Sequence, residues 1–188
     1  MPKEIKAKMQ ELRREIEIPS DVEVSIENNE IIARKEGKEN KRKFDKVEIS
    51  KKDSKIIVSM KKATRKEKKQ INTAIAHIKN IFLGLKEKFV YKLQICSVHF
   101  PMNVSIDKVK NDMVIKNFLG EKKERRSRIM PNTNVKIDGD IITVDSPDVE
   151  AAGQTAANME IITKIRNRDR RIFQDGIWMT EKAGVKLE

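Results

Sequence analysis

A catalytic role requires a nucleophile and a base, and the chain offers few groups of either kind. It contains one cysteine, Cys96, and two histidines, His77 and His99. We expect a strand over residues 89–100, on which Cys96 and His99 would point to opposite faces because they are three residues apart. We therefore interpret both as packing residues, and His77 as a half-buried histidine on the flank of a helix. The sequence favours a protein that is not an enzyme.

Ligands for a metal and loops for a phosphate are equally scarce. The single cysteine excludes an internal disulfide and leaves a cysteine-rich zinc site three ligands short. No G-x-x-x-x-G-K loop occurs, and no stretch of about 18 apolar residues is present that could span a membrane. We predict no metal, no cofactor, no small-molecule substrate and no membrane partner.

The positive charge of the chain says more about its function than the search for catalytic, metal and phosphate-loop motifs does. The chain has 41 Lys and Arg against 29 Asp and Glu, a formal net charge of +12. Such a charge attracts nucleic acid, an anionic membrane surface or an acidic protein. The half that ends at Lys86 is rich in lysine, especially over residues 34–43 and 61–69, and an ordinary solvated surface explains these runs as well as a binding surface does.

Arginine is concentrated in the second half of the chain. A first arginine cluster (Arg125, Arg126, Arg128) follows Gly120 and Lys122, and a second arginine cluster (Arg166, Arg168, Arg170, Arg171) lies further on. The planar guanidinium binds phosphate through two hydrogen bonds and stacks on bases, so clustered arginine predicts contact with RNA or DNA. Phe173 and Trp178 follow the second cluster, where each would either stack on an exposed base or be buried under the sheet.

The elements that position these clusters follow a pattern of strands and a helix that occurs twice in the sequence. Alternating apolar residues at 22–26 and at 104–106 indicate the first strand of each copy. Further apolar residues follow at 31–32 and 114–115, and a basic run comes after a glycine in both copies. Each copy continues with a pair of strands, near 47–49 and 56–58 in one and near 135–137 and 141–144 in the other.

Each copy ends with a helix whose start is marked chemically. Thr64, with Glu67 three residues later, forms a capping-box pattern before the first helix. Ser146 is the expected N-cap of the second helix, with Pro147 at the first helical position. The order of strands and helix predicts an α+β protein built by internal duplication. We expect two similar domains, residues 1–86 and 87–188, each an antiparallel β-sheet with one helix packed on a face.

Several strings of residues resemble one known family, the sixth protein of the large ribosomal subunit in its archaeal and eukaryotic form. The similarity covers nearly the whole chain and is most specific from Ala76 onward. The strings, in the order of the family, are AHIKN (76–80), FVYKL running into HFPM (89–102), NFLGEK (117–122), GQTAAN (153–158), RDRRIFQDGIW (168–178) and EKAG (181–184).

The resemblance implies a structural protein of the cytoplasmic ribosome whose partners are large-subunit ribosomal RNA and neighbouring ribosomal proteins. It also implies that residues 87–188 make the main RNA contact, close to the region that engages translational GTPases. The residues carried over by motif are Gln154, Asn158, Arg168, Arg170 and Arg171. Five further residues join the RNA-binding set because they are positively charged: Lys122, Arg125, Arg126, Arg128 and Arg166.

Two other functions stay open. A generic binder of double-stranded nucleic acid would use the same charges without preferring its own site. A basic adaptor would instead dock an acidic protein partner on this surface.

Overall fold

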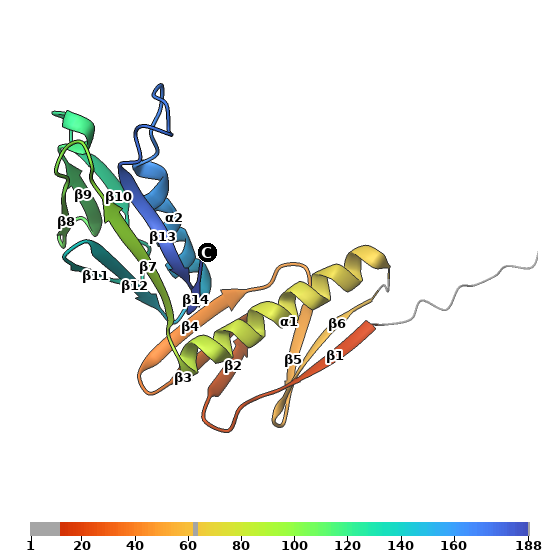
Figure 1. The fold of residues 1–188 in the computed structure, drawn as a ribbon. Helices are drawn as coiled ribbons and strands as arrows, with labels where there is room; N and C mark the ends of the chain where they lie inside the picture. Colours follow the sequence, from red (N-terminus) through yellow and green to blue (C-terminus); the bar gives the residue numbers. More distant parts are fainter. Residues whose placement is uncertain (1–11, 62–63, 188) are drawn as a thin grey trace, which may run out of the picture. The chain divides into compact units, whose positions relative to one another are not determined.

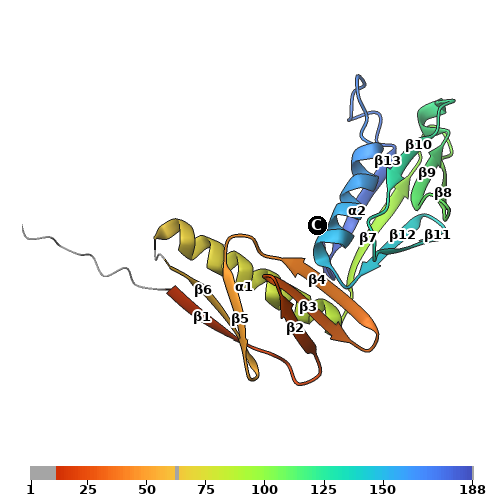
Figure 2. The same cartoon turned by 180° about the vertical axis from the view of Figure 1, so that it is seen from behind.

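The chain folds into two compact units that meet in sequence between Lys86 and Glu87 (Figures 1 and 2). The structure is a computed structural model that describes residues 12–61 and 64–187. Within these residues, each unit has two antiparallel sheets that share one helix, and a separate hydrophobic core fills the space between sheets and helix.

The first unit contains two three-stranded sheets in its described residues. One has the order β1-β6-β5 and the other the order β2-β3-β4. Helix α1 (Arg65–Lys86) packs on strands of both sheets and begins directly after Thr64, where the capping pattern places its start. Its apolar stripe, including Ile71, Ile78 and Leu85, is buried because it faces the sheets. The strands are β1 (Leu12–Glu17), β2 (Glu23–Glu27), β3 (Glu30–Lys35), β4 (Lys38–Lys43), β5 (Glu48–Lys52) and β6 (Lys55–Met60).

The second unit repeats this plan with a larger sheet. Its sheets have the orders β10-β9-β8 and β11-β12-β7-β13-β14. Helix α2 (Val149–Ile162) packs on β10 of the small sheet and on β7, β12 and β13 of the large one (Figure 2). The strands are β7 (Phe89–Cys96), β8 (Asn103–Asp107), β9 (Asp112–Lys116), β10 (Arg125–Arg128), β11 (Asn134–Asp138), β12 (Ile141–Ser146), β13 (Gly176–Lys182) and β14 (Val185–Lys186), with a 3₁₀ turn η1 (Phe118–Gly120).

The α+β class and the single helix in each repeated unit are confirmed. The strands of each unit are divided between two sheets, and β1, β4, β10, β13 and β14 add to the predicted strands. Strand β1 has one buried residue, Ile16, among charged neighbours, so its alternation is weak in the sequence. Strand β13 carries a bulge between Met179 and Glu181 that interrupts the period of two.

Two predictions about element ends are wrong. Strand β7 ends at Cys96, before residue 100, because the backbone N–H groups of Val98 and His99 donate to the Asp175 carboxylate instead of to a strand. Helix α2 has Asp148 as its N-cap, whose Oδ1 accepts from the Glu150 N–H. The buried Ser146 hydroxyl donates to a carbonyl in the turn before β11 and accepts from the Asp148 N–H.

Candidate nucleic-acid interface

The ten residues predicted to bind RNA lie in three segments of the second unit. Lys122 precedes β10, and the first arginine cluster forms β10 itself. Gln154 and Asn158 lie on α2. The second arginine cluster lies in the loop that joins α2 to β13, residues 164–175, which we call the arginine loop.

Arg125 serves the fold of this unit. Its guanidinium makes two hydrogen bonds to the Glu121 carboxylate, at 2.8 Å from Nε and 2.6 Å from Nη2. Nη1 donates to the Ile162 carbonyl at the end of α2, at 2.6 Å, and the group lies 4.2 Å from the centre of the Phe118 ring. The hydrogen bond from Arg125 lowers the pKa of Glu121. This arginine therefore joins η1, β10 and α2, and its donors are largely used within the protein.

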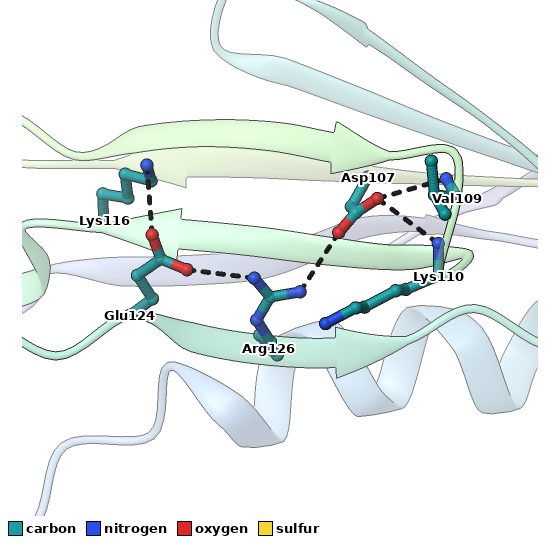
Figure 3. A network of polar contacts seen from close by, with 6 residues as sticks. All are labelled: Asp107, Val109, Lys110, Lys116, Glu124 and Arg126. Atoms are coloured by element: carbon teal, nitrogen blue, oxygen red, sulfur yellow. Dashed lines mark hydrogen bonds and ion pairs between the residues drawn. The ribbon is translucent and has the colours of Figure 1, made fainter.

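Arg126 points to the other face of β10 and joins a chain of alternating charges (Figure 3). Its two terminal nitrogens lie 3.2 Å from carboxylate oxygens of Asp107 and Glu124, and Lys116 lies 3.1 Å from the second oxygen of Glu124. The backbone N–H of Lys110 and then Arg126 lower the pKa of Asp107, while Lys116 is the main cause of the lowered pKa of Glu124. Two cations thus face two anions within this network, so the charges of Arg126 and Lys116 are already paired with carboxylates.

The backbone of Arg128 lies beside the polar pair of α2, whereas its side chain, two residues after Arg126, points to the same face of β10 as Arg126. Gln154 Nε2 donates to Asn158 Oδ1 at 2.8 Å, and Asn158 Nδ2 donates to the Arg128 carbonyl at 3.3 Å. The spacing of four residues therefore places both amides on one face of the helix, next to β10. The Arg128 side chain is exposed and has no ion pair among the described residues.

The arginine loop is shaped by contacts within itself. Asp169 Oδ1 accepts from the Arg171 N–H, and the Asp169 carbonyl accepts from the N–H groups of Ile172 and Phe173. Arg168 lies over the Phe173 ring, 4.8 Å from its centre. The other three arginines of the loop are exposed and have no ion pair in residues 12–61 and 64–187.

A buried carboxylate anchors the end of this loop, and sequence reasoning missed it. Asp175 is 1% exposed and accepts from the N–H groups of Val98 and His99 through Oδ1, while Oδ2 lies 2.6 Å from His99 Nδ1. The His99 ring stacks on Phe173 at 4.6 Å. Burial acts to raise the pKa of Asp175, but the hydrogen bonds from His99 and Val98 outweigh it and hold the pKa below its usual value.

His99 therefore has a specific structural role. The residues around His99 predict a strand. No pattern near His99 in the sequence indicates that it pairs with Asp175, which lies 76 positions later.

The two arginine clusters lie close together in this unit. Arg125 donates to Ile162, two residues before the arginine loop begins, and Arg168 contributes to the lowered pKa of Glu121. Lys122 is exposed beside Glu121. Five of the ten predicted residues are exposed cations that have no ion pair in the described parts of the chain: Lys122, Arg128, Arg166, Arg170 and Arg171.

Other kinds of site have no basis in the described residues. They contain no group of three or more His, Cys, Asp or Glu placed to hold a metal ion. Within the same residues, no helix has the length and apolar character needed to cross a membrane.

Comparison with known proteins identifies the family. The family model described as ribosomal protein L6 matches residues 100–176, which include all ten predicted residues. The large ribosomal subunit protein uL6 of Methanococcus vannielii is 40% identical over 178 residues, covering 94% of this chain and 97% of the relative. Those of Methanobrevibacter smithii (39% over 173 residues, 91% and 96% covered) and Sulfurisphaera tokodaii (40% over 180 residues, 94% and 96% covered) are similarly close. The chain belongs to the ribosomal protein L6 family of large-subunit proteins.

Proposed function

We propose that this chain is a structural component of the large ribosomal subunit that binds large-subunit ribosomal RNA mainly through residues 87–188. Its other partners are neighbouring ribosomal proteins, and its place is on the ribosome, close to the region that engages translational GTPases. Family membership supports the place and the partners. The role is one of binding, with no catalytic step.

One observation carries the RNA contact. Three exposed arginines without ion pairs in the described chain, Arg166, Arg170 and Arg171, lie in one loop of the second unit, within the segment that the family model matches. Phosphates bind such groups readily, because no internal carboxylate must be displaced first. The higher net charge of the first half does not argue against this, since phosphate contacts depend on a few positioned groups rather than on total charge.

The ten predicted residues then divide by role. Arg166, Arg170, Arg171, Arg128 and Lys122 contact phosphates. Arg125 and Arg126 position the strand and its turn, and Arg168 positions Phe173. The amides of Gln154 and Asn158 bond each other and β10, which leaves the Gln154 Oε1 atom to accept a hydrogen bond from a ribose 2′-hydroxyl or a base edge.

The proposal is tested by RNA binding across a salt series. The full chain is titrated with large-subunit ribosomal RNA and with an unrelated RNA duplex. A triple variant, R166A/R170A/R171A, is measured beside a control that also removes three positive charges, K41A/K66A/K69A. These lysines are exposed in the first unit and have no ion pair among its described residues.

We expect the arginine variant to bind ribosomal RNA about a hundredfold more weakly at about 0.1 M salt, and the lysine variant to lose far less. Equal losses in both variants would contradict the assignment to the second unit. Equal affinity of the wild-type chain for both RNAs would favour the generic binder of nucleic acid. An acidic protein that binds at this surface and is displaced poorly by RNA would favour the adaptor.

A further inference from the structure

An open hollow of about 780 Å³ lies beside the arginine loop in the second unit. Its apolar lining includes three side chains that are unusually exposed: Val98 at 74%, Ile161 at 60% and Trp178 at 37%. Exposed apolar groups gathered in a concave site mark a binding surface, because a folded protein otherwise covers them.

The indole of Trp178 is held in place. Its Nε1 donates to the Gln174 carbonyl at 3.1 Å, and its backbone belongs to β13, which pairs with β7. The polar atom of the ring is thus satisfied, and the exposed part of the side chain is the apolar ring. An aromatic ring fixed in this way is a preorganised stacking platform.

Phe173, the other aromatic residue near the arginine loop, already has other side chains of the protein against its ring. Phe173 has Arg168 over its ring and His99 stacked on it. Its role is to support the loop, so of the two aromatic residues that follow the second arginine cluster, Trp178 is the one free to receive a ligand.

Charge at the hollow fits an anionic ligand. Lys164 and Arg170 belong to the lining and have no ion pair in the described residues, while Glu160 is the one carboxylate in the lining. An apolar peptide side chain would gain nothing from two unpaired cations. A nucleotide would use both features, because its base stacks on an aromatic ring and its phosphate binds Lys and Arg.

We propose that this hollow binds one unstacked nucleobase of RNA, stacked on Trp178, with a flanking phosphate against Lys164 and Arg170. The inference rests on the proposed RNA-binding function and adds a specific site to it. It also implies that the RNA presents an unpaired nucleotide at this contact, since a base within a duplex cannot reach the ring.

The chain offers a direct readout because Trp178 is its only tryptophan. The full chain is titrated with large-subunit ribosomal RNA while tryptophan fluorescence and RNA binding are recorded separately. Two short hairpin RNAs are added as probes, one with a single bulged adenosine and one fully paired. Three variants are compared: W178A, W178F, and the control F100A, which removes an exposed aromatic of the same unit that does not line the hollow.

We expect ribosomal RNA to quench Trp178, and the bulged hairpin to quench it at lower concentration than the paired one. W178A should weaken binding between about fivefold and about a hundredfold, the range found for loss of one base stack. W178F keeps a ring and should stay near wild type, as should F100A. If W178A does not fold, the quenching of wild-type Trp178 by the bulged and paired hairpins still decides.

The site and the function fail in different ways. Ribosomal RNA that binds without quenching, with W178A unchanged in affinity, would overturn the base site and leave the proposed function standing. Equal quenching by both hairpins would also overturn it. Absence of any binding to ribosomal RNA would overturn the proposed function and the base site with it.

Discussion

The two arginine clusters look alike in the sequence and differ in the structure. In the first cluster, Arg125 and Arg126 are bonded to three carboxylates, those of Glu121, Glu124 and Asp107. In the second, Asp169 is used by the backbone of its own turn, and Arg166, Arg170 and Arg171 have no ion pair among the residues described. Arginine density alone therefore does not identify a phosphate site. The nearby acids, and what they are bonded to, decide which guanidinium groups are available.

The support of each cluster also differs. Ion pairs on partly exposed surface hold the first cluster, whereas a buried carboxylate and a ring stack hold the end of the arginine loop. Interactions of the second kind contribute more to stability, because water screens them less.

Asp175→Ala has the largest expected effect on folding. It leaves two backbone N–H groups and the His99 ring without their acceptor in a buried place, which should lower the free energy of unfolding of the second unit by about 3 kcal/mol. The measurement is chemical denaturation followed by Trp178 fluorescence. Asp169→Ala, an exposed loop acid, serves as the control and should stay within about 1 kcal/mol. If Asp175→Ala and Asp169→Ala lower the free energy of unfolding by similar amounts, Asp175 does not anchor the loop more strongly than an exposed acid does.

Arg125→Ala should lower the free energy of unfolding by about 2 kcal/mol, because it removes a bidentate pair and a bond to the end of α2. Arg125→Lys keeps the charge without the fork and should recover only part of the loss. On folded protein, RNA affinity should change by about threefold or less, since no phosphate contact is removed. A large loss of RNA affinity in a variant whose free energy of unfolding is unchanged would show that Arg125 belongs to the binding surface.

Acid should destabilise the second unit through its carboxylates. The pKa values of Asp175 and Glu121 are lowered in the folded protein from ordinary values of 3.8 and 4.5. A lowered pKa stabilises the fold above the ordinary value, and this contribution disappears as the pH falls through the folded pKa. The unfolding free energy should therefore decrease as the pH falls below about 5, with a smaller decrease in D175N and E121Q. A pH dependence identical to wild type in both variants would contradict these assignments.

The smallest effect is expected from K116A/R126A. Both side chains are exposed members of the alternating network, and exposed ion pairs contribute little. We expect a small change in the unfolding midpoint by calorimetry and an unfolding transition as cooperative as that of wild type. A clear loss of cooperativity would show that the network supports the small sheet.

The sequence predicts the repeat and both helices because apolar residues recur there at regular spacing. It does not predict β1, where only Ile16 is buried, or the end of β7, which depends on Asp175 far along the chain. The N-cap of α2 falls on Asp148 because Ser146 is already bonded within the turn.

In the candidate site, too, the sequence predicts contacts between residues close in the chain and does not predict contacts between distant segments. The spacing of Gln154 and Asn158 predicts one helix face, and they do bond each other. The bond from Arg125 to Glu121 is local and lies within reach of sequence reasoning, since the two are four residues apart. The contacts of Arg125 with Ile162 and of His99 with Asp175 join distant segments, which a single sequence does not reveal.

The central claim is that the arginines without ion pairs bind RNA phosphates and that those within ion pairs do not. The most direct test is the salt dependence of binding to large-subunit ribosomal RNA for two variants that each remove two cations, R170A/R171A and K116A/R126A. We predict that R170A/R171A lowers the slope of log affinity against log salt by about 2, roughly one for each phosphate that the protein no longer neutralises, and that K116A/R126A leaves it near wild type. Equal reductions in both variants would contradict the claim.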